Sequence, residues 1–123
     1  MLLTSLAVLA STAMLQSNDY RVEILYQEKQ GLRSRTVKVR DVVDLSEGTF
    51  ELEDDDLGEA PLLIGDVEID NGRIFMDLTV CAIGGDDCDS IAERRVRFVQ
   101  GSRERVTGET RSGVYYRITF RPN

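Results

Sequence analysis

Apolar and polar residues alternate with a period of two along most of the chain after residue 18. The clearest case is the segment 113–121, where Val114, Tyr116, Ile118 and Phe120 alternate with polar and aromatic residues. This alternation is typical of antiparallel β-strands that bury one face and expose the other. Similar patterns predict strands in the segments 20–28, 35–41, 48–53 and 94–100, and in both arms of a hairpin within 63–83.

Glycines punctuate these segments and predict turns between short strands. The spacing predicts one all-β domain over residues 18–123, built as a small antiparallel β-sandwich of about seven or eight strands and Ig-like in the loose sense. A small antiparallel β-barrel is the alternative. The acidic, proline-terminated segment 53–61 is predicted to be a mobile loop. The predicted turns contain Gly31, Gly48, Gly58, Asn71-Gly72, Gly84-Gly85, Gly101 and Gly108.

The first residues of the chain differ from the rest because they carry no charge and are mostly apolar. The run is short for a bilayer span, which needs about 20 apolar residues. Small residues at 11 and 13 favour a signal peptide over residues 1–17, cleaved near Ala13 or Ser17. A buried N-terminal helix or strand is the alternative. The signal peptide would make the protein periplasmic or secreted, with no membrane span in the mature chain.

Asn71-Gly72 lies between two alternating segments and predicts a two-residue hairpin turn, because both central residues of a type I′ turn need positive φ. This turn sets Asp70 opposite Arg73 and, four pairs further along, Asp66 opposite Asp77. Two carboxylates directly opposite one another destabilise a sheet unless a positive charge offsets them. We expect either a neighbouring arginine or a bound cation beside this pair.

The two cysteines, Cys81 and Cys88, bracket a glycine- and aspartate-rich turn at the end of this hairpin. Alternation places Cys81 on the outer face of the sheet. The neighbouring carboxylates would raise the pKa of a thiol, which disfavours a redox site. Zinc needs about four ligands, and the chain has two cysteines and no histidine. We therefore predict a structural disulfide that clips the turn.

The formal net charge of −7 is unevenly distributed along the chain. Residues 41–90 hold sixteen acidic residues and one arginine, whereas the segments before and after them are net basic. We expect the fold to bring acidic and basic strands side by side, with an acidic face for a cationic partner as the alternative. Nucleic acid is not an expected partner, because the chain is acidic and lacks basic segments with aromatic and glycine signatures.

Catalytic motifs are missing from the sequence. The absence of histidine excludes Ser–His–Asp and Cys–His constellations, and no general base can be named, so we do not expect an enzyme. We predict a non-catalytic exported domain that binds a protein or surface polymer, as a chaperone-like module or an inhibitor of a basic secreted enzyme. The partner could add a strand to an exposed sheet edge, or it could dock on the acidic segment 51–59 and the Asp86–Asp89 loop. The candidate partner-binding residues are Asp54, Asp55, Asp56, Tyr115 and Arg117.

No cofactor is expected except calcium, which prefers the oxygen ligands that clustered aspartates supply. Asp86, Asp87 and Asp89 in the cysteine turn are the candidate ligands, and solvated loop carboxylates are the alternative. The corresponding function would be a calcium-stabilised structural module of an envelope or surface assembly.

Overall fold

The structure is a computed structural model that describes residues 17–54, 56 and 58–123. The predicted signal peptide therefore lies almost wholly outside the described residues. Eight antiparallel strands and one short 3-10 turn, η1 (Leu45–Glu47), make up the regular structure of these described residues. The strands are β1 (Asp19–Gln30), β2 (Arg33–Asp44), β3 (Thr49–Leu52), β4 (Leu63–Asp70), β5 (Arg73–Cys81), β6 (Ser90–Val99), β7 (Glu104–Glu109) and β8 (Val114–Pro122).

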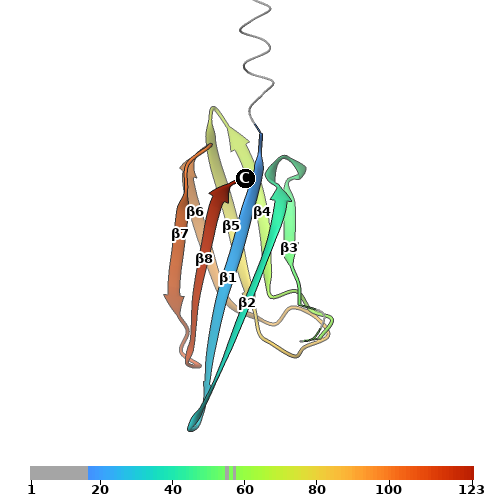
Figure 1. Cartoon of the computed structure of the whole chain (residues 1–123), viewed down its shortest axis with the longest axis vertical. Helices are drawn as coiled ribbons and strands as arrows, with labels where there is room; N and C mark the ends of the chain where they lie inside the picture. The colour runs from blue at the N-terminus through green and yellow to red at the C-terminus, as the bar shows by residue number, and fades with distance from the viewer. Residues whose placement is uncertain (1–16, 55, 57) are drawn as a thin grey trace, which may run out of the picture.

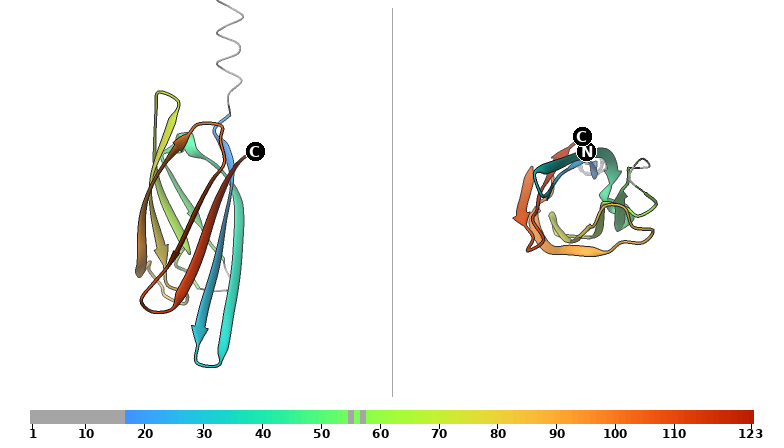
Figure 2. Two further views of the ribbon diagram at one scale, coloured as in Figure 1. Left: turned by 90° about the vertical axis from the view of Figure 1, so that its left-hand side faces the viewer. Right: turned by 90° about the horizontal axis from the view of Figure 1, so that it is seen from below.

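The strands form two four-stranded sheets, which confirms the predicted sandwich (Figure 1). Sheet A has the order β2-β1-β8-β7, and sheet B has the order β3-β4-β5-β6. Both sheets curve around one core when the molecule is viewed from below (Figure 2). Within each sheet, paired strands are consecutive in sequence, except that β8 returns to pair with β1. This up-and-down order differs from the Greek-key order of immunoglobulin domains, so the likeness to them is limited to two packed sheets.

The core contains the side chains that the alternation predicted to point inwards. Alternate residues of β1 and β8, the two central strands of sheet A, are completely or almost completely buried. Phe98 stacks on Phe120 and meets Tyr20 edge-on, with ring centroids 5.7 and 5.9 Å apart, so the core joins both sheets. The buried residues of the two central strands are Tyr20, Val22, Ile24, Tyr26, Val114, Tyr116, Ile118 and Phe120.

The β4–β5 hairpin has the predicted register. Asp70 pairs with Arg73 and Asp66 with Asp77, and Asn71 and Gly72 have positive φ values of 49° and 74°. The like-charged Asp66–Asp77 pair has the arginine neighbour that the sequence allowed. Arg95 on β6 lies opposite Asp77, and its Nε donates to Asp77 Oδ1 at 3.1 Å.

Gly108 was predicted to mark a turn, and this prediction is wrong, because Gly108 lies inside β7 opposite Tyr116. The Tyr116 ring occupies the space that a side chain at 108 would need. A Cβ built on Gly108 would lie 2.2 Å from Tyr116 Oη, far inside van der Waals contact. The glycine therefore makes room for a buried aromatic ring within the strand.

Arg94 joins the two sheets where β6 of sheet B faces β7 of sheet A. Its Nη1 donates to the Thr107 carbonyl at 2.8 Å and to Tyr116 Oη at 3.2 Å. In the part of the chain that the structure describes, no strand ladder connects β6 to β7, so this side chain supplies polar contacts that cross the boundary. We call this boundary the β6–β7 seam.

Candidate functional site

Two acidic loops that are distant in sequence meet at one end of the sandwich (Figure 1). The first connects β3 to β4 across residues 53–62, and the second connects β5 to β6 across residues 82–89. The Ala60 N–H donates to the Gly85 carbonyl at 3.3 Å. A Cβ on Gly58 would lie only 3.3 Å from that carbonyl oxygen, so the glycine allows the two loops to approach closely.

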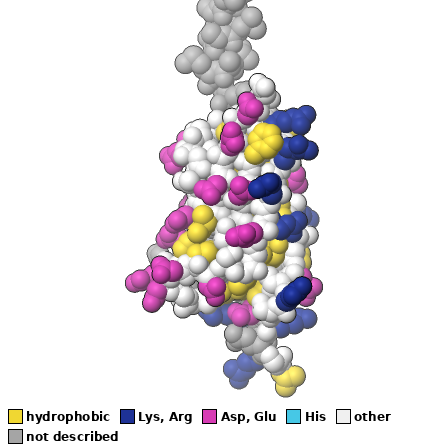
Figure 3. All heavy atoms as spheres, turned by 180° about the vertical axis from the view of Figure 1, so that it is seen from behind, with side chains coloured by type: hydrophobic (Ala, Val, Ile, Leu, Met, Phe, Trp, Pro, Cys, Tyr) yellow, Lys and Arg dark blue, Asp and Glu magenta, His cyan; other side chains and the backbone are white. Residues whose placement is uncertain are grey.

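The predicted aspartates lie on these two loops, and we call the surface formed by Asp54, Asp56, Asp86, Asp87 and Asp89 the acidic end. Asp54 is half-buried and the other four are exposed. Asp54 Oδ1 accepts from the Asp56 N–H at 3.0 Å, which turns the chain back within its own loop. Asp55 lies outside the described residues. Figure 3, drawn from behind, shows acidic side chains gathered on the side where the loops project.

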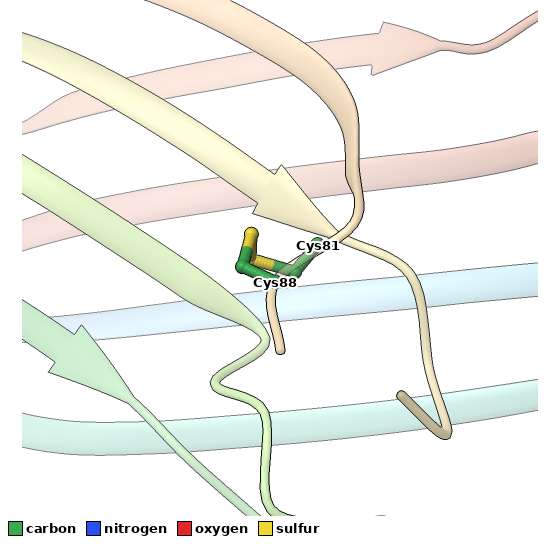
Figure 4. The surroundings of a disulfide bond; sticks show 2 residues. All are labelled: Cys81 and Cys88. Atoms are coloured by element: carbon green, nitrogen blue, oxygen red, sulfur yellow. A yellow bond between two sulfur atoms is a disulfide. The ribbon is translucent and has the colours of Figure 1, made fainter. Parts of the chain in front are cut away.

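The disulfide closes the second loop as predicted. Cys81 and Cys88 are bonded, with their Cα atoms 5.0 Å apart (Figure 4). The Ala82 N–H donates to the Asp89 carbonyl at 2.8 Å, which joins the two ends of the loop beside the disulfide. The aspartates at 86, 87 and 89 are thus held on a short, covalently closed turn.

The prediction that the clipped turn lies on the outer side of the sheet is wrong in one respect, because Cys81 is completely buried. The Cys81 N–H donates to the Leu62 carbonyl of the first loop at 3.0 Å. Ile83 packs against the core, and its backbone N–H donates to the phenolic oxygen of Tyr26 in sheet A. The turn therefore closes one end of the core instead of standing on the face of the sheet.

The residues that the structure describes do not form a ready-made calcium site. No group of three or more Cys, Asp or Glu side chains comes close enough there to hold a metal ion. Asp86, Asp87 and Asp89 share a short loop without converging on one point. A calcium site remains a prediction, which a shift in melting temperature on adding calcium or a chelator would test.

An open hollow of about 770 Å³ lies on the outer face of sheet B. Phe75 is half-buried between Glu68 and Arg97 in one cross-strand row, and Asp77 lies between Asp66 and Arg95 in the next. The Asp77–Arg95 ion pair is largely exposed on both sides, so it contributes little to stability. The hollow presents mixed charges around one aromatic ring.

Tyr115 and Arg117 lie on the outer face of β8 in sheet A, as the alternation predicted, and both are half-buried. Arg117 lines a second hollow on this face, of about 170 Å³, whereas Tyr115 does not. Sequence reasoning missed the other arginines of this hollow because they come from four strands at opposite ends of the chain. Their common location depends on the pairing of β1 with β8.

The uneven charge distribution is therefore only partly neutralised by neighbouring strands. The Asp77–Arg95 pair follows the expectation that acidic and basic strands lie side by side. Sheet A instead brings the two basic segments of the sequence together, and the described acidic residues of the two loops gather at one end of the sandwich.

Comparison with family models, curated proteins and solved structures finds no match to this chain. Within the described part of the chain, no helix has the length and apolar character needed to cross a membrane.

Proposed function

We propose that this protein is a non-catalytic, exported binding domain whose acidic end docks on a cationic surface of another protein. One observation carries the proposal: loops 53–62 and 82–89 are held against one another, so aspartates from distant parts of the sequence contribute to one surface. A shared surface of one charge attracts an oppositely charged partner and speeds its association.

The acidic end keeps its charge available for such a partner. Within the described residues, the ion pairs are Lys38–Glu23 and Arg95–Asp77, and neither includes an aspartate of the acidic end. The disulfide and the hydrogen bonds between the loops restrict the backbone that carries these aspartates. Less ordering is then needed when a partner binds, which favours affinity.

Strand addition, the other route open to a sheet protein, has less support. At the β6–β7 seam, Arg94 already bonds to a β7 carbonyl. The long edge of β2 carries Arg33, Arg35, Lys38 and Arg40. Charged side chains on an edge strand are a common means of discouraging pairing with another chain. We therefore favour docking through the loops, and a basic secreted enzyme is the partner class that fits this chemistry.

The test is capture of partners from a periplasmic or secreted extract, followed by mass spectrometry and binding measurements with the purified partner. The variant Asp54→Asn/Asp56→Asn/Asp86→Asn/Asp87→Asn removes four charges from the acidic end. The matched control, Asp41→Asn/Glu47→Gln/Asp66→Asn/Asp70→Asn, removes four charges elsewhere.

We expect a basic partner that the wild type and the control retain, and that the loop variant and high salt both release. A partner held equally by both variants, or held equally at high salt, would contradict docking through the acidic end.

A further inference from the structure

The outer face of sheet A contains a second charged surface, of opposite sign to the acidic end. All four strands of this sheet contribute arginines to the hollow of about 170 Å³. There are five of these arginines, and we call the surface that they form the arginine hollow. Glu23 is the carboxylate that also lines it. The arginines are Arg40 from β2, Arg21 from β1, Arg117 and Arg121 from β8, and Arg105 from β7.

The guanidinium groups of the arginine hollow have no partner within the part of the chain that the structure describes. None of them forms a side-chain hydrogen bond or an ion pair there, and the carboxylate of Glu23 pairs with Lys38, at 3.8 Å. Five arginines therefore share the hollow with one carboxylate, and that carboxylate forms its ion pair with a lysine that does not line the hollow. This leaves the hollow strongly positive in a protein that is acidic as a whole.

Pairing between β1 and β8 adds a second, independent observation. Arg21 and Arg121 are direct cross-strand partners, so two like charges face one another on adjacent strands. Such a pair destabilises a sheet unless an opposite charge lies nearby. The corresponding like-charged pair on sheet B, Asp66–Asp77, has Arg95 beside it, whereas Arg21 and Arg121 have no carboxylate within ion-pair distance among the described residues.

We propose that the arginine hollow binds a compact ligand that carries two or more phosphate or sulfate groups. Guanidinium groups bind such oxyanions through paired, charge-assisted hydrogen bonds. The side chains span from β2 to β7, roughly 14 Å at the usual spacing between strands, which is more than one phosphate can bridge. The hydroxyl of Thr119, which also lines the hollow, is a further donor.

The acidic end favours a compact ligand over a long polyanion. Sheet A is one face of a small domain whose formal net charge is −7, so a long nucleic acid or polyanionic chain would be repelled wherever it extended beyond that face. A short ligand can satisfy the arginines without meeting the aspartates.

The experiment is a titration of the isotope-labelled full chain with tripolyphosphate, followed by amide chemical shifts, in parallel with sucrose octasulfate. The test variant is Arg21→Gln/Arg121→Gln. The matched control is Arg73→Gln/Arg97→Gln, which removes two charges from sheet B.

We expect saturable binding with shifts confined to β1, β2, β7 and β8. The test variant removes two charge-assisted contacts that each contribute about tenfold, so it should weaken binding about a hundredfold, and the control should leave binding unchanged. Saturable binding of either probe with this pattern of shifts supports the proposal.

Absence of saturable binding to both probes, equal weakening by both variants, or tighter binding of a 12-nucleotide RNA would each overturn the proposal. The unliganded test variant provides a measurement that does not depend on any probe. Removal of the opposed Arg21–Arg121 charges should raise its melting temperature above that of the wild type, and a decrease would contradict the electrostatic argument.

Discussion

Individual residues show how a small core accommodates large aromatic side chains. Tyr116 is almost completely buried, lies against Gly108, and accepts a hydrogen bond from Arg94 at the β6–β7 seam. A side chain added at 108 would therefore displace a ring that serves both the core and the seam. The glycine is needed for the space it leaves, not for an unusual φ.

Gly108→Ala should reduce the free energy of unfolding by about 1–3 kcal/mol, the usual cost of overpacking a core. Tyr116→Leu removes the obstructing ring, so the double variant should lose less than the sum of the two single variants. Urea denaturation of all four proteins measures this coupling. Strict additivity would show that the Cβ and the ring do not compete for the same space.

The buried tyrosines predict how stability changes at high pH. Burial raises the pKa of Tyr20, and a hydrogen bond from the Gly101 N–H partly offsets this increase. Burial also raises the pKa of Tyr26, and the nearby Glu28 carboxylate raises it further. Above pH 10 the unfolded chain loses these protons first, so the native state becomes less favourable as the pH rises.

Tyr20→Phe should be about 1 kcal/mol less stable than the wild type at pH 7, because the hydrogen bonds to Gly101 and Ser102 are lost. Above pH 10 the two stability curves should converge, since phenylalanine has no proton to lose. Denaturation from pH 7 to 11, with tyrosinate absorbance, tests this. If the difference in unfolding free energy between the two proteins stays constant to pH 11, Tyr20 does not contribute to alkaline unfolding.

At the scale of the element, the disulfide-closed turn between β5 and β6 positions three of the five aspartates of the acidic end. The Ala60 N–H of the β3–β4 loop donates to the Gly85 carbonyl of this turn, and Ile83 of the turn packs against the core. Opening the disulfide therefore affects both the stability of the domain and the arrangement of its charged loops.

Reduction of the disulfide should destabilise the protein by roughly 2–3 kcal/mol, the loop-entropy value for so short a ring. Melting with and without reductant measures the difference. The control is Cys81→Ala/Cys88→Ala, whose melting temperature should not respond to reductant. An unchanged wild-type melting temperature would show that the closed turn does not stabilise the fold.

The elements also show what a single sequence reveals and what it does not. Alternation and the Asn71-Gly72 signal are local, so the β4–β5 register was predictable pair by pair. Strand β7 was missed because it is short and Gly108 resembles a turn residue. The burial of Cys81 depends on contacts with Leu62 across two loops, and local alternation contains no information about such contacts.

For the whole molecule, pairing between the two ends of the described chain decides where the charges lie. The acidic loops could be named from the sequence because each is a continuous run. The arginine hollow could not, because β1 and β8 are separated by most of the chain before they meet in sheet A. The result is an acidic domain with a separate basic face, and we propose a different kind of partner for each.

The pairing of β8 with β1 has one more consequence, for where the chain can be cut. The Asn123 N–H donates to the Asp19 carbonyl at 2.9 Å, so the two ends of the sandwich's chain are neighbours. Opening the chain at another hairpin would therefore leave every strand pairing in place. A circular permutant with a short linker from 123 to 18 and new termini at the exposed Asn71-Gly72 tip should fold and melt cooperatively. The β8–β1 pairing thus makes the position of the chain ends a property that can be changed without changing which strands pair.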